Sequence, residues 1–321
     1  MAIALPNNVS RLQVRHLMLL SLLVEYGSVR NAAAHMHLTQ PAVSRLLSDL
    51  ESAFNAKLFE RTPRGITPYP KALALLRRSQ VALSELRLGL TEMADSPSRP
   101  LIRIGTSPHV MRGLVPIVAN MVEMTLPTLR LSLQTAPSED LFASLLNGDL
   151  DCIVARLPLS SREGKEQAKI RMIAKELHYE VLYEEPQCVV VRKGHRLARR
   201  RQVAWSEMEG ARWLLPATGG LAIRPLTDAF LRCGLQVPEA SVVCEHFVFG
   251  IPIVAETDLL MVVPLTEAKR HSSILTVLHV SEPLVSPPVV LATRVASLAL
   301  AYLPNILDFF RDAVERREKV R

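Results

Sequence analysis

The sequence predicts three parts in series: an all-α helix-turn-helix domain with a wing, a long linker helix and an α/β region. Three patterns support this order. Residues 39–51 separate apolar from polar positions with a helical period, residues 70–94 follow a period of 3.5, and strands alternate with helices from residue 101 onward. With 321 residues and 49% hydrophobic content, the chain holds enough apolar material for more than one core.

The first two predicted helices are short and have clear boundaries. Residues 12–26 have helical periodicity, and Gly27 provides the left-handed residue that commonly ends a helix. Ser28 can cap the next helix, whose alanines at 32–34 allow close packing. Thr39 can cap the third helix, which therefore starts at a defined point.

The third helix sorts its side chains by face. Its apolar positions recur at i, i+3, i+4 and i+7, and they are Val43, Leu46, Leu47 and Leu50. The opposite face carries Gln40, Pro41, Ser44, Arg45 and Ser48. Amide, hydroxyl and guanidinium groups hydrogen-bond to base edges and phosphates, whereas an ordinary solvated face is rich in Glu and Lys. The pattern predicts a helix that contacts DNA.

A wing is predicted directly after this helix. In residues 56–68, two short extended segments flank a turn that contains Gly65. Arg61 and Arg64 lie beside the turn, from which they can reach phosphates or a minor groove. The alternative is that both are ordinary exposed loop arginines, and the neighbouring helix favours the DNA role.

Residues 70–94 predict one long helix. Its apolar stripe alternates steps of four and three, through Ala72, Leu76, Ser79, Leu83, Leu86 and Leu90. A period of 3.5 suits a seam between two helices, so we expect this helix to form a dimer interface. The alternative is that the stripe packs on the chain's own domain. A polar, proline-containing linker follows at residues 95–100.

From residue 101 the pattern predicts a parallel α/β sheet. Strands are expected at 101–104, 129–135 and 152–155, with helices near 109–123 and 138–147 between them. A second unit of this kind begins at 187–192 and continues through 212–215, a helix over 223–234, and the segments 240–245, 251–255 and 259–263. After the proline-rich stretch 283–288 come a last strand at 289–293 and a final helix with Leu303, Ile306, Leu307 and Phe310.

The charge is uneven along the chain. Residues 1–100 carry 12 Lys and Arg against 7 Asp and Glu, whereas residues 101–321 carry 26 against 24. A basic first third and a nearly neutral remainder fit a nucleic-acid module followed by a domain of another kind. Residues 1–10 have no basic n-region, and the apolar run 17–24 is too short to span a membrane. We therefore expect a soluble, cytoplasmic protein with no membrane partner.

The cysteines are dispersed. Cys152, Cys188, Cys233 and Cys244 include no C-x-x-C pair, so the sequence predicts neither a metal site nor a disulfide framework. Reduced, buried thiols are the simplest interpretation. The alternative is a thiol switch that uses Cys233 and Cys244.

The first 70 or so residues closely resemble LysR-type transcriptional regulators. The residues that carry this resemblance are Gly27-Ser28, Ala32-Ala33, Leu38 to Ser44, Leu50-Glu51, Leu58 to Arg61 and Arg64-Gly65. Weaker matches at 104–107, 147–151 and 194–197 extend it over the whole chain. The resemblance implies a winged helix-turn-helix domain at 1–69, a linker helix and hinge at 70–100, and an effector-binding domain at 101–321.

The resemblance also implies that the effector-binding domain has two α/β lobes, like a periplasmic binding protein. The chain would cross between the lobes twice, near 183–186 and 283–288. Lobe I would then comprise 101–182 and 284–321, and lobe II 183–283. Such regulators form dimers and often tetramers, and RNA polymerase is a further candidate partner.

We expect the DNA contacts to come from the third helix, the wing and one neighbouring residue. Gln40, Pro41, Ser44 and Arg45 would lie at base edges or adjacent phosphates, with Arg30, Arg61 and Arg64 on the backbone. Two such modules joined through Leu76, Leu83, Leu86 and Leu90 would match an inverted-repeat site, because a two-fold dimer matches a palindrome.

We expect a small anionic organic effector outside the carboxyl ends of the strands, where open α/β sheets bind ligands. Thr106 and Ser107 occupy one such point, and Thr218 and Gly219 another. Arg156 follows a strand and can pair with a carboxylate or phosphate. Phe247 and Phe249 can line the cleft, although core packing is the alternative for both, as helix capping is for Ser107 and Thr218.

Two other classes of protein fit poorly. Gly105-Thr106-Ser107-Pro108-His109 lacks the last glycine of G-x-S-x-G, and the chain contains no H-E-x-x-H, Walker A or G-x-G-x-x-G motif. We therefore expect neither an enzyme nor a cofactor. A stand-alone solute-binding protein would need an export signal, and the helix-turn-helix argues against it.

Overall fold

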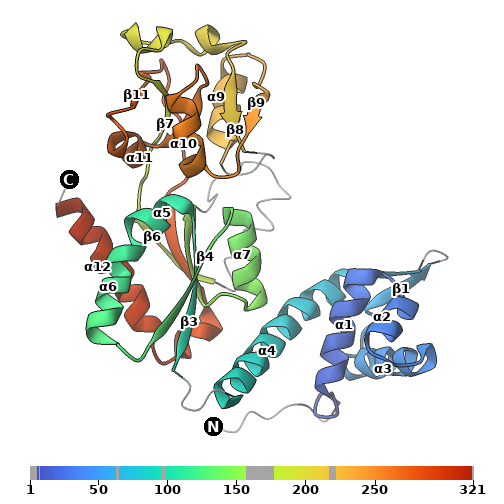
Figure 1. The fold of residues 1–321 in the computed structure, drawn as a ribbon. Coiled ribbons are helices and arrows are strands. Elements are labelled where there is room, and N and C mark those ends of the chain that lie inside the picture. Colours follow the sequence, from blue (N-terminus) through green and yellow to red (C-terminus); the bar gives the residue numbers. More distant parts are fainter. Residues whose placement is uncertain are drawn as a thin grey trace. The chain divides into compact units, whose positions relative to one another are not determined.

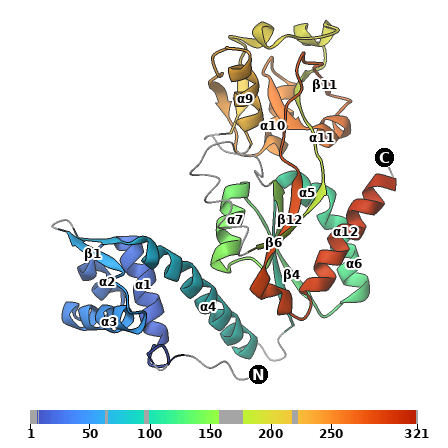
Figure 2. The same ribbon diagram turned by 180° about the vertical axis from the view of Figure 1, so that it is seen from behind.

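The computed structural model describes Pro6 and residues 8–62, 65–94, 99–156, 177–216 and 222–319. The chain separates into two compact units. The first is Met1–Arg99 with the short segment Leu146–Asp149, and the second consists of Pro100–Leu145 and Leu150–Arg321. Figures 1 and 2 show residues 8–94 in blue to teal and residues 100–319 in green to red.

The first unit is built on three helices and a small hairpin. Helices α1 (Val14–Tyr26), α2 (Val29–His35) and α3 (Gln40–Ala53) bury leucines and alanines in one core. Gly27 ends α1 with a φ of 58°, Ser28 accepts a hydrogen bond from the Asn31 amide, and Thr39 accepts one from the Ala42 amide. These side chains satisfy amides that the first turn of a helix leaves without partners. The helix boundaries thus follow from local chemistry.

The wing is a two-stranded antiparallel sheet. Strands β1 (Phe59–Thr62) and β2 (Gly65–Pro68) pair with Arg61 opposite Ile66, while Phe59 and Ile66 are buried in the core of the helices. Arg64 lies outside the described residues. The three helices and this hairpin form a winged helix-turn-helix.

Helix α4 (Pro70–Ala94) divides its stripe between two environments. Ala72 and Ser79 are buried, and Leu76 packs against the core of the first unit. For Leu76 this packing favours the alternative, in which the stripe packs on the chain's own domain, because α1 and the wing contact α4. Farther along, Leu86 is 50% exposed and Leu90 71% exposed.

Lobe I of the second unit has a five-stranded sheet in the order β4-β3-β5-β12-β6. Strands β3 (Leu101–Thr106), β4 (Arg130–Thr135) and β5 (Cys152–Arg156) are parallel. Strand β12 (Val289–Arg294) runs antiparallel between β5 and β6 (Leu177–Tyr183). The three strands predicted to be parallel are parallel, and the structure adds two strands, β12 and β6, that run antiparallel to each other. β6 leaves lobe I at the end of the sheet where β12 returns, so these two strands run in opposite directions.

Helices cover both faces of this sheet. Helices α6 (Val115–Thr125) and α12 (Leu303–Lys319) lie side by side on one face, and α7 (Ser138–Asn147) lies on the other (Figures 1 and 2). The helix expected near 109–123 is two helices, because α5 (Pro108–Gly113) ends at Gly113 and Pro116 begins a new first turn in α6. A short 3-10 helix, η3 (Val295–Ala299), precedes α12.

Lobe II contains two small sheets. Strand β7 (Gln187–Arg192) lies between β10 (Met261–Pro264) and β11 (Leu275–Val277), antiparallel to both, and β8 (Trp213–Leu215) runs parallel to β9 (Ala240–Val243). The surrounding helices are α9 (Arg224–Arg232), α10 (Phe247–Ala255), α11 (Leu265–Arg270), η1 (Arg196–Arg199) and η2 (Trp205–Met208). Residues 251–255 therefore belong to a helix, and lobe II is mixed rather than parallel.

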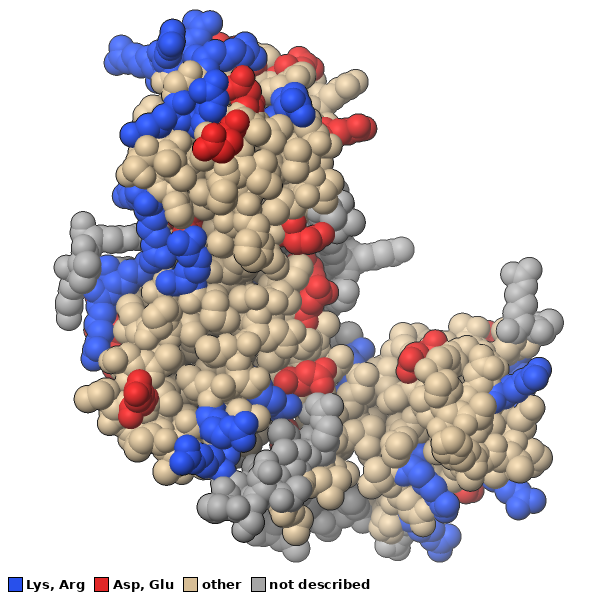
Figure 3. All heavy atoms as spheres, viewed as in Figure 1, with Lys and Arg blue, Asp and Glu red and all other residues tan. Residues whose placement is uncertain are grey.

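The charge of the second unit is locally concentrated, although its total is close to neutral. Basic side chains gather over η1 at the end of lobe II (Figure 3), where Lys193, Arg196, Arg199, Arg200 and Arg201 are all exposed. The count over residues 101–321 hides this segregation, because acidic residues elsewhere balance it.

Candidate functional site

The polar face of α3 is exposed beside the wing. Gln40, Pro41 and Arg45 are exposed and Ser44 is half-buried, while Val43 and the leucines of the opposite face are buried. Arg30 at the start of α2 and Arg61 in β1 are exposed as well. The exposed face of α3 thus presents amide, guanidinium and hydroxyl groups to solvent, while its opposite, apolar face packs in the core of the first unit.

Glu51 fixes the wing to α3, a role that the sequence analysis missed. Its carboxylate accepts hydrogen bonds from the amides of Leu58 at 2.8 Å and Phe59 at 3.4 Å, and from Lys57 Nζ at 2.9 Å. Burial alone would raise the pKa of Glu51, but these hydrogen bonds outweigh it and lower the pKa. The only sequence signal was Glu51 within a motif of the resemblance.

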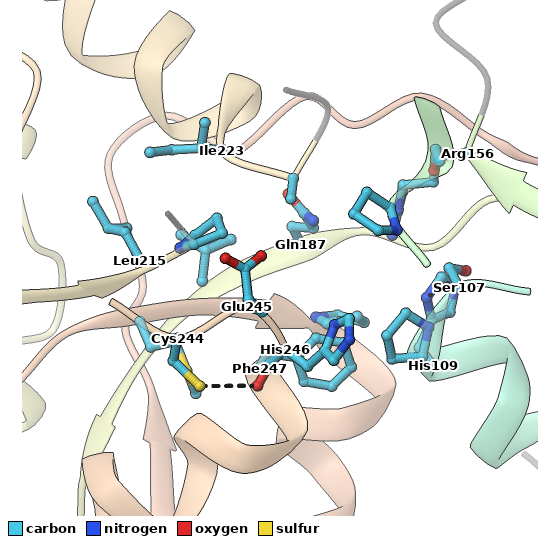
Figure 4. Close-up of a pocket in the computed structure, with 18 of the residues that line it drawn as sticks. Ser107, His109, Arg156, Gln187, Leu215, Ile223, Cys244, Glu245, His246 and Phe247 are labelled. Carbon is cyan, nitrogen blue, oxygen red and sulfur yellow. Dashed lines mark hydrogen bonds between the residues drawn. The ribbon is translucent and has the colours of Figure 1, made fainter. Parts of the chain in front are cut away.

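A second candidate site is a pocket between the lobes of the second unit (Figure 4). Ser107 and His109 line it beyond the carboxyl end of β3, and Arg156 lines it at the end of β5. Leu214, Leu215 and the segment Cys244–Phe247 line it from lobe II. Figure 4 shows Ser107, His109 and Arg156 together at one end, with Leu215 and Ile223 at the other. The end with Ser107, His109 and Arg156 is polar, and Glu245 places a carboxylate between it and the apolar side chains of Leu215 and Ile223.

His109 is a neutral group at the polar end. Its ring is buried, with Nδ1 3.2 Å from Ser107 Oγ, and its Nε2 has no hydrogen-bond partner among the described residues. Burial, and then the positive charges of Arg156 and Arg317, hold the pKa of His109 well below its usual value. Gln187, which the sequence did not single out, also lines the pocket, and within the described part of the chain its buried Oε1 has no hydrogen-bond partner.

The expected effector residues have different environments. Ser107, Arg156 and Phe247 line the pocket, whereas Thr106 is fully buried at the end of β3 and does not. Phe249 is 68% exposed and lies outside the lining. Thr218 and Gly219 fall outside the described residues, although Pro216 and Ala222 on either side line the pocket.

Arg156 does not present a free guanidinium to the pocket. Its Nη1 donates to the carbonyl oxygen of Pro287 at 2.8 Å, and its Nη2 donates to that of Glu185 at 2.6 Å. Burial lowers the pKa of Arg156, although the negative charge of Glu185 opposes this effect. Two of the five N–H donors of Arg156 are therefore already bonded to backbone carbonyl groups.

Models of two known domain families match the chain. The model described as "LysR substrate binding domain" matches residues 95–315, and that described as "Bacterial regulatory helix-turn-helix protein, lysR family" matches residues 14–72. The chain belongs to the LysR family. A LysR relative, the HTH-type transcriptional regulator GbpR of Rhizobium radiobacter, is 32% identical over 249 residues, which cover 76% of this chain and 78% of GbpR.

Other LysR proteins are more distant. The DNA-binding transcriptional dual regulator OxyR of Escherichia coli is 28% identical over 211 residues, which cover 65% of either chain. Among solved structures, a full-length OxyR variant from Pseudomonas aeruginosa has a TM-score of 0.56 at 18% identity and covers 95% of both chains. A full-length BenM mutant has a TM-score of 0.54 at 20% identity, covering 96% of this chain and 97% of BenM. These two structures confirm the fold.

Membership of the LysR family settles the class of function. The chain is a DNA-binding transcriptional regulator with an effector-binding domain, and the family is one of regulators rather than enzymes. LysR regulators bind DNA and small-molecule effectors, and they typically oligomerise. In the described part of the chain, no helix is long and apolar enough to cross a membrane.

Proposed function

We propose that this LysR regulator binds an inverted-repeat promoter site as a homodimer and changes its activity when a small organic effector enters the pocket between the lobes. The observation that carries the DNA part is the exposed row of Gln40, Pro41 and Arg45 on α3, above a buried apolar face. Guanidinium and amide forks can pair with guanine and adenine edges, and Pro41 can contact a thymine methyl. Because its target is promoter DNA, we expect the protein in the cytoplasm.

We assign seven residues to the DNA interface. Gln40, Pro41, Ser44 and Arg45 would contact bases or adjacent phosphates, and Arg30, Arg61 and Arg64 the backbone. Dimers would form through Leu83, Leu86 and Leu90 on α4. Two dimers would then pair into a tetramer, and the DNA-bound protein would contact RNA polymerase.

The DNA interface is tested with Arg45→Ala in the full chain, using promoter fragments that the wild-type chain selects from genomic DNA. Loss of a bidentate contact should weaken binding by about 1 to 3 kcal/mol and relax specificity at one base pair. Arg15→Ala, on α1, is the matched control. Unchanged operator affinity in Arg45→Ala would exclude the proposed facing of α3.

The effector would place its apolar part against Leu215, Ile223 and Phe247, and an acceptor group near Ser107, Gln187 and Arg156. Thr218 and Gly219 would complete the lobe II side. Carboxylates and phosphates accept charge-assisted, often bidentate hydrogen bonds from arginine, which supports an anionic effector.

A thermal-shift screen of small carboxylates, sugars and aromatic compounds tests the effector site. A ligand at 100 times its Kd should add about 2.7 kcal/mol to the free energy of unfolding. Ser107→Ala and Phe247→Ala should each reduce that shift, and a hit whose shift is the same in both variants binds elsewhere.

A thiol switch is the alternative, favoured by the position of Cys244 in the pocket lining and the exposure of Cys233. The relative from Pectobacterium carotovorum subsp. carotovorum, 29% identical over 211 residues, is named a hydrogen peroxide-inducible genes activator. Peroxide that changes the DNA footprint of the wild-type chain, but not that of Cys233→Ser, would support this alternative.

A further inference from the structure

The two crossovers between the lobes meet at one guanidinium. The chain leaves lobe I after Tyr183 and enters β7 at Gln187, and it returns to lobe I at β12. Glu185 lies in the first crossover and Pro287 in the second. Arg156, only 6% exposed, donates to the carbonyl oxygens of both at 2.6 and 2.8 Å. One side chain of lobe I therefore holds both hinge segments.

Glu185 extends this connection to both lobes. It is 2% exposed, and its Oε1 accepts hydrogen bonds from the amide of Thr266 at 3.1 Å and from Thr266 Oγ1 at 2.9 Å, in α11 of lobe II. Its Oε2 accepts one from Arg317 Nη2 at 2.7 Å, in α12 of lobe I. The Arg317 guanidinium also lies 4.8 Å from the centre of the Tyr183 ring. The first crossover is thus fixed by side chains of both lobes.

Arg156 belongs to the pocket as well as to the hinge. It lines the pocket, and an arginine has five N–H donors, so the two bonds to carbonyl groups leave further donors on the same group. A carboxylate carries a negative charge and can accept two parallel hydrogen bonds from a guanidinium, so it is a stronger acceptor for Arg156 than a neutral carbonyl oxygen. An anionic group that binds the remaining donors would therefore draw the guanidinium into the pocket and away from the crossovers.

We propose that Arg156 is the positioning residue that transmits effector binding to the hinge. An acceptor group on the effector takes the guanidinium from the carbonyl oxygens of Glu185 and Pro287, and both crossovers are released together. The effector then shifts the lobes because it binds the released arrangement more tightly than the held one. This inference rests on the proposed effector site, and it names the chemical group that the site senses and the element that responds.

The experiment measures the distance between the lobes in the effector-free full chain by double electron–electron resonance. One spin label is placed on Cys233, which is exposed in lobe II, and the other on Met124→Cys, at an exposed position of α6 in lobe I. Cys188→Ala and Cys244→Ala form the common background, and excess unlabelled chain suppresses distances between subunits. Arg156→Gln should broaden the distribution of distances between the two labels relative to the parent chain. Glu185→Gln should also broaden this distribution.

Arg294→Gln is the matched control. Arg294 is also buried and donates to two backbone carbonyl groups, those of Leu145 at 2.6 Å and Leu150 at 2.7 Å, but both lie in lobe I. Arg294→Gln should lower the free energy of unfolding of the chain without changing the distribution of distances between the labels. Equal broadening in Arg294→Gln and Arg156→Gln would overturn the proposal, as would a parent-like distribution in Arg156→Gln.

A second variant covers the case in which Arg156→Gln does not fold. Thr266→Val removes one donor from the Glu185 carboxylate at a half-buried position, and it should broaden the distribution to a smaller extent. A parent-like distribution in both Thr266→Val and Glu185→Gln would overturn the proposal. Since no effector is needed, failure here leaves the proposed effector site standing. A failed ligand screen beside the expected distance changes would instead remove the effector site and the sensing step that depends on it, and would leave only the hold of Arg156 on the crossovers.

Discussion

Gly65 of the wing lies directly against Gly27 at the end of α1. A Cβ on Gly65 would stand 2.3 Å from the Gly27 carbonyl oxygen, and the φ of Gly65 is 135°, a region that other residues rarely adopt. The next residue, Ile66, donates its amide to the same carbonyl oxygen at 2.9 Å. The wing is therefore attached to α1 through backbone atoms, and only glycine fits at position 65.

Gly65→Ala should weaken the attachment of the wing. We expect a loss of about 1 to 3 kcal/mol in the first unit, because the strained φ and the steric clash add to each other. Denaturant unfolding and DNA binding measure the effect. Gly89→Ala, at a helical position of α4 with nothing within 4 Å, should be neutral or stabilising. If Gly65→Ala matches Gly89→Ala in both assays, the close contact is not important for the wing.

Leu86→Glu with Leu90→Glu should dissociate the oligomer. Both side chains are exposed on α4, and each leucine removed from an interface forfeits about 1.5 to 3 kcal/mol of burial. Sedimentation velocity measures the change in mass. Met124→Glu, which also places a carboxylate at an exposed apolar position, is the control. A double variant that sediments like the wild-type chain would place the interface elsewhere.

Asp151→Asn should destabilise lobe I by about 3 to 5 kcal/mol, since it breaks a buried ion pair and leaves Arg103 charged. Asp151 accepts from the amide of Arg103 at 2.7 Å and from its guanidinium at 2.6 and 3.1 Å. Asp308→Asn, which removes an exposed partner of Arg311, should cost at most about 1 kcal/mol. Equal unfolding midpoints for the two variants would contradict this ranking.

Acidification should destabilise the second unit through His109. The pKa of His109 is lowered in the folded chain, so below a pH of about 6.5 the unfolded chain binds a proton that the native residue does not. The free energy of unfolding should then fall by up to about 1.4 kcal/mol per pH unit until the native pKa is reached. His109→Gln should remove this component from the dependence of Tm on pH. An unchanged dependence would show that His109 is protonated as easily in the native state.

Local sequence patterns were sufficient to predict the three helices of the helix-turn-helix in the first unit. The facing of α3 and the ends of α1 and α2 follow from residues a few positions apart, such as Val43 with Leu47, or Gly27 with Ser28. The stripe of α4 shows the limit of this approach. The period of the stripe is uniform, but Leu76 packs against the core of the first unit while Leu90 is exposed. The difference depends on which parts of α4 other elements cover.

The structure of the second unit was harder to predict, because it depends more on residues that are far apart in the sequence. Ser107 could be placed at the pocket because the end of a strand is a local feature, but Thr106, one residue earlier, points into the core. The bonds of Arg156 join it to residues 29 and 131 positions away, which no local pattern reveals. The direction of β12 was missed for the same reason, because it depends on where the chain re-enters lobe I.

The position of β12 constrains the order of events during synthesis. This strand lies between β5 and β6, yet it follows all of lobe II in the chain. The ribosome must therefore release the whole of lobe II before the sheet of lobe I can close, whereas the DNA-binding unit is already complete. Until then the nascent chain exposes the unpaired edges of β5 and β6, so we expect chaperones to be needed most at this stage.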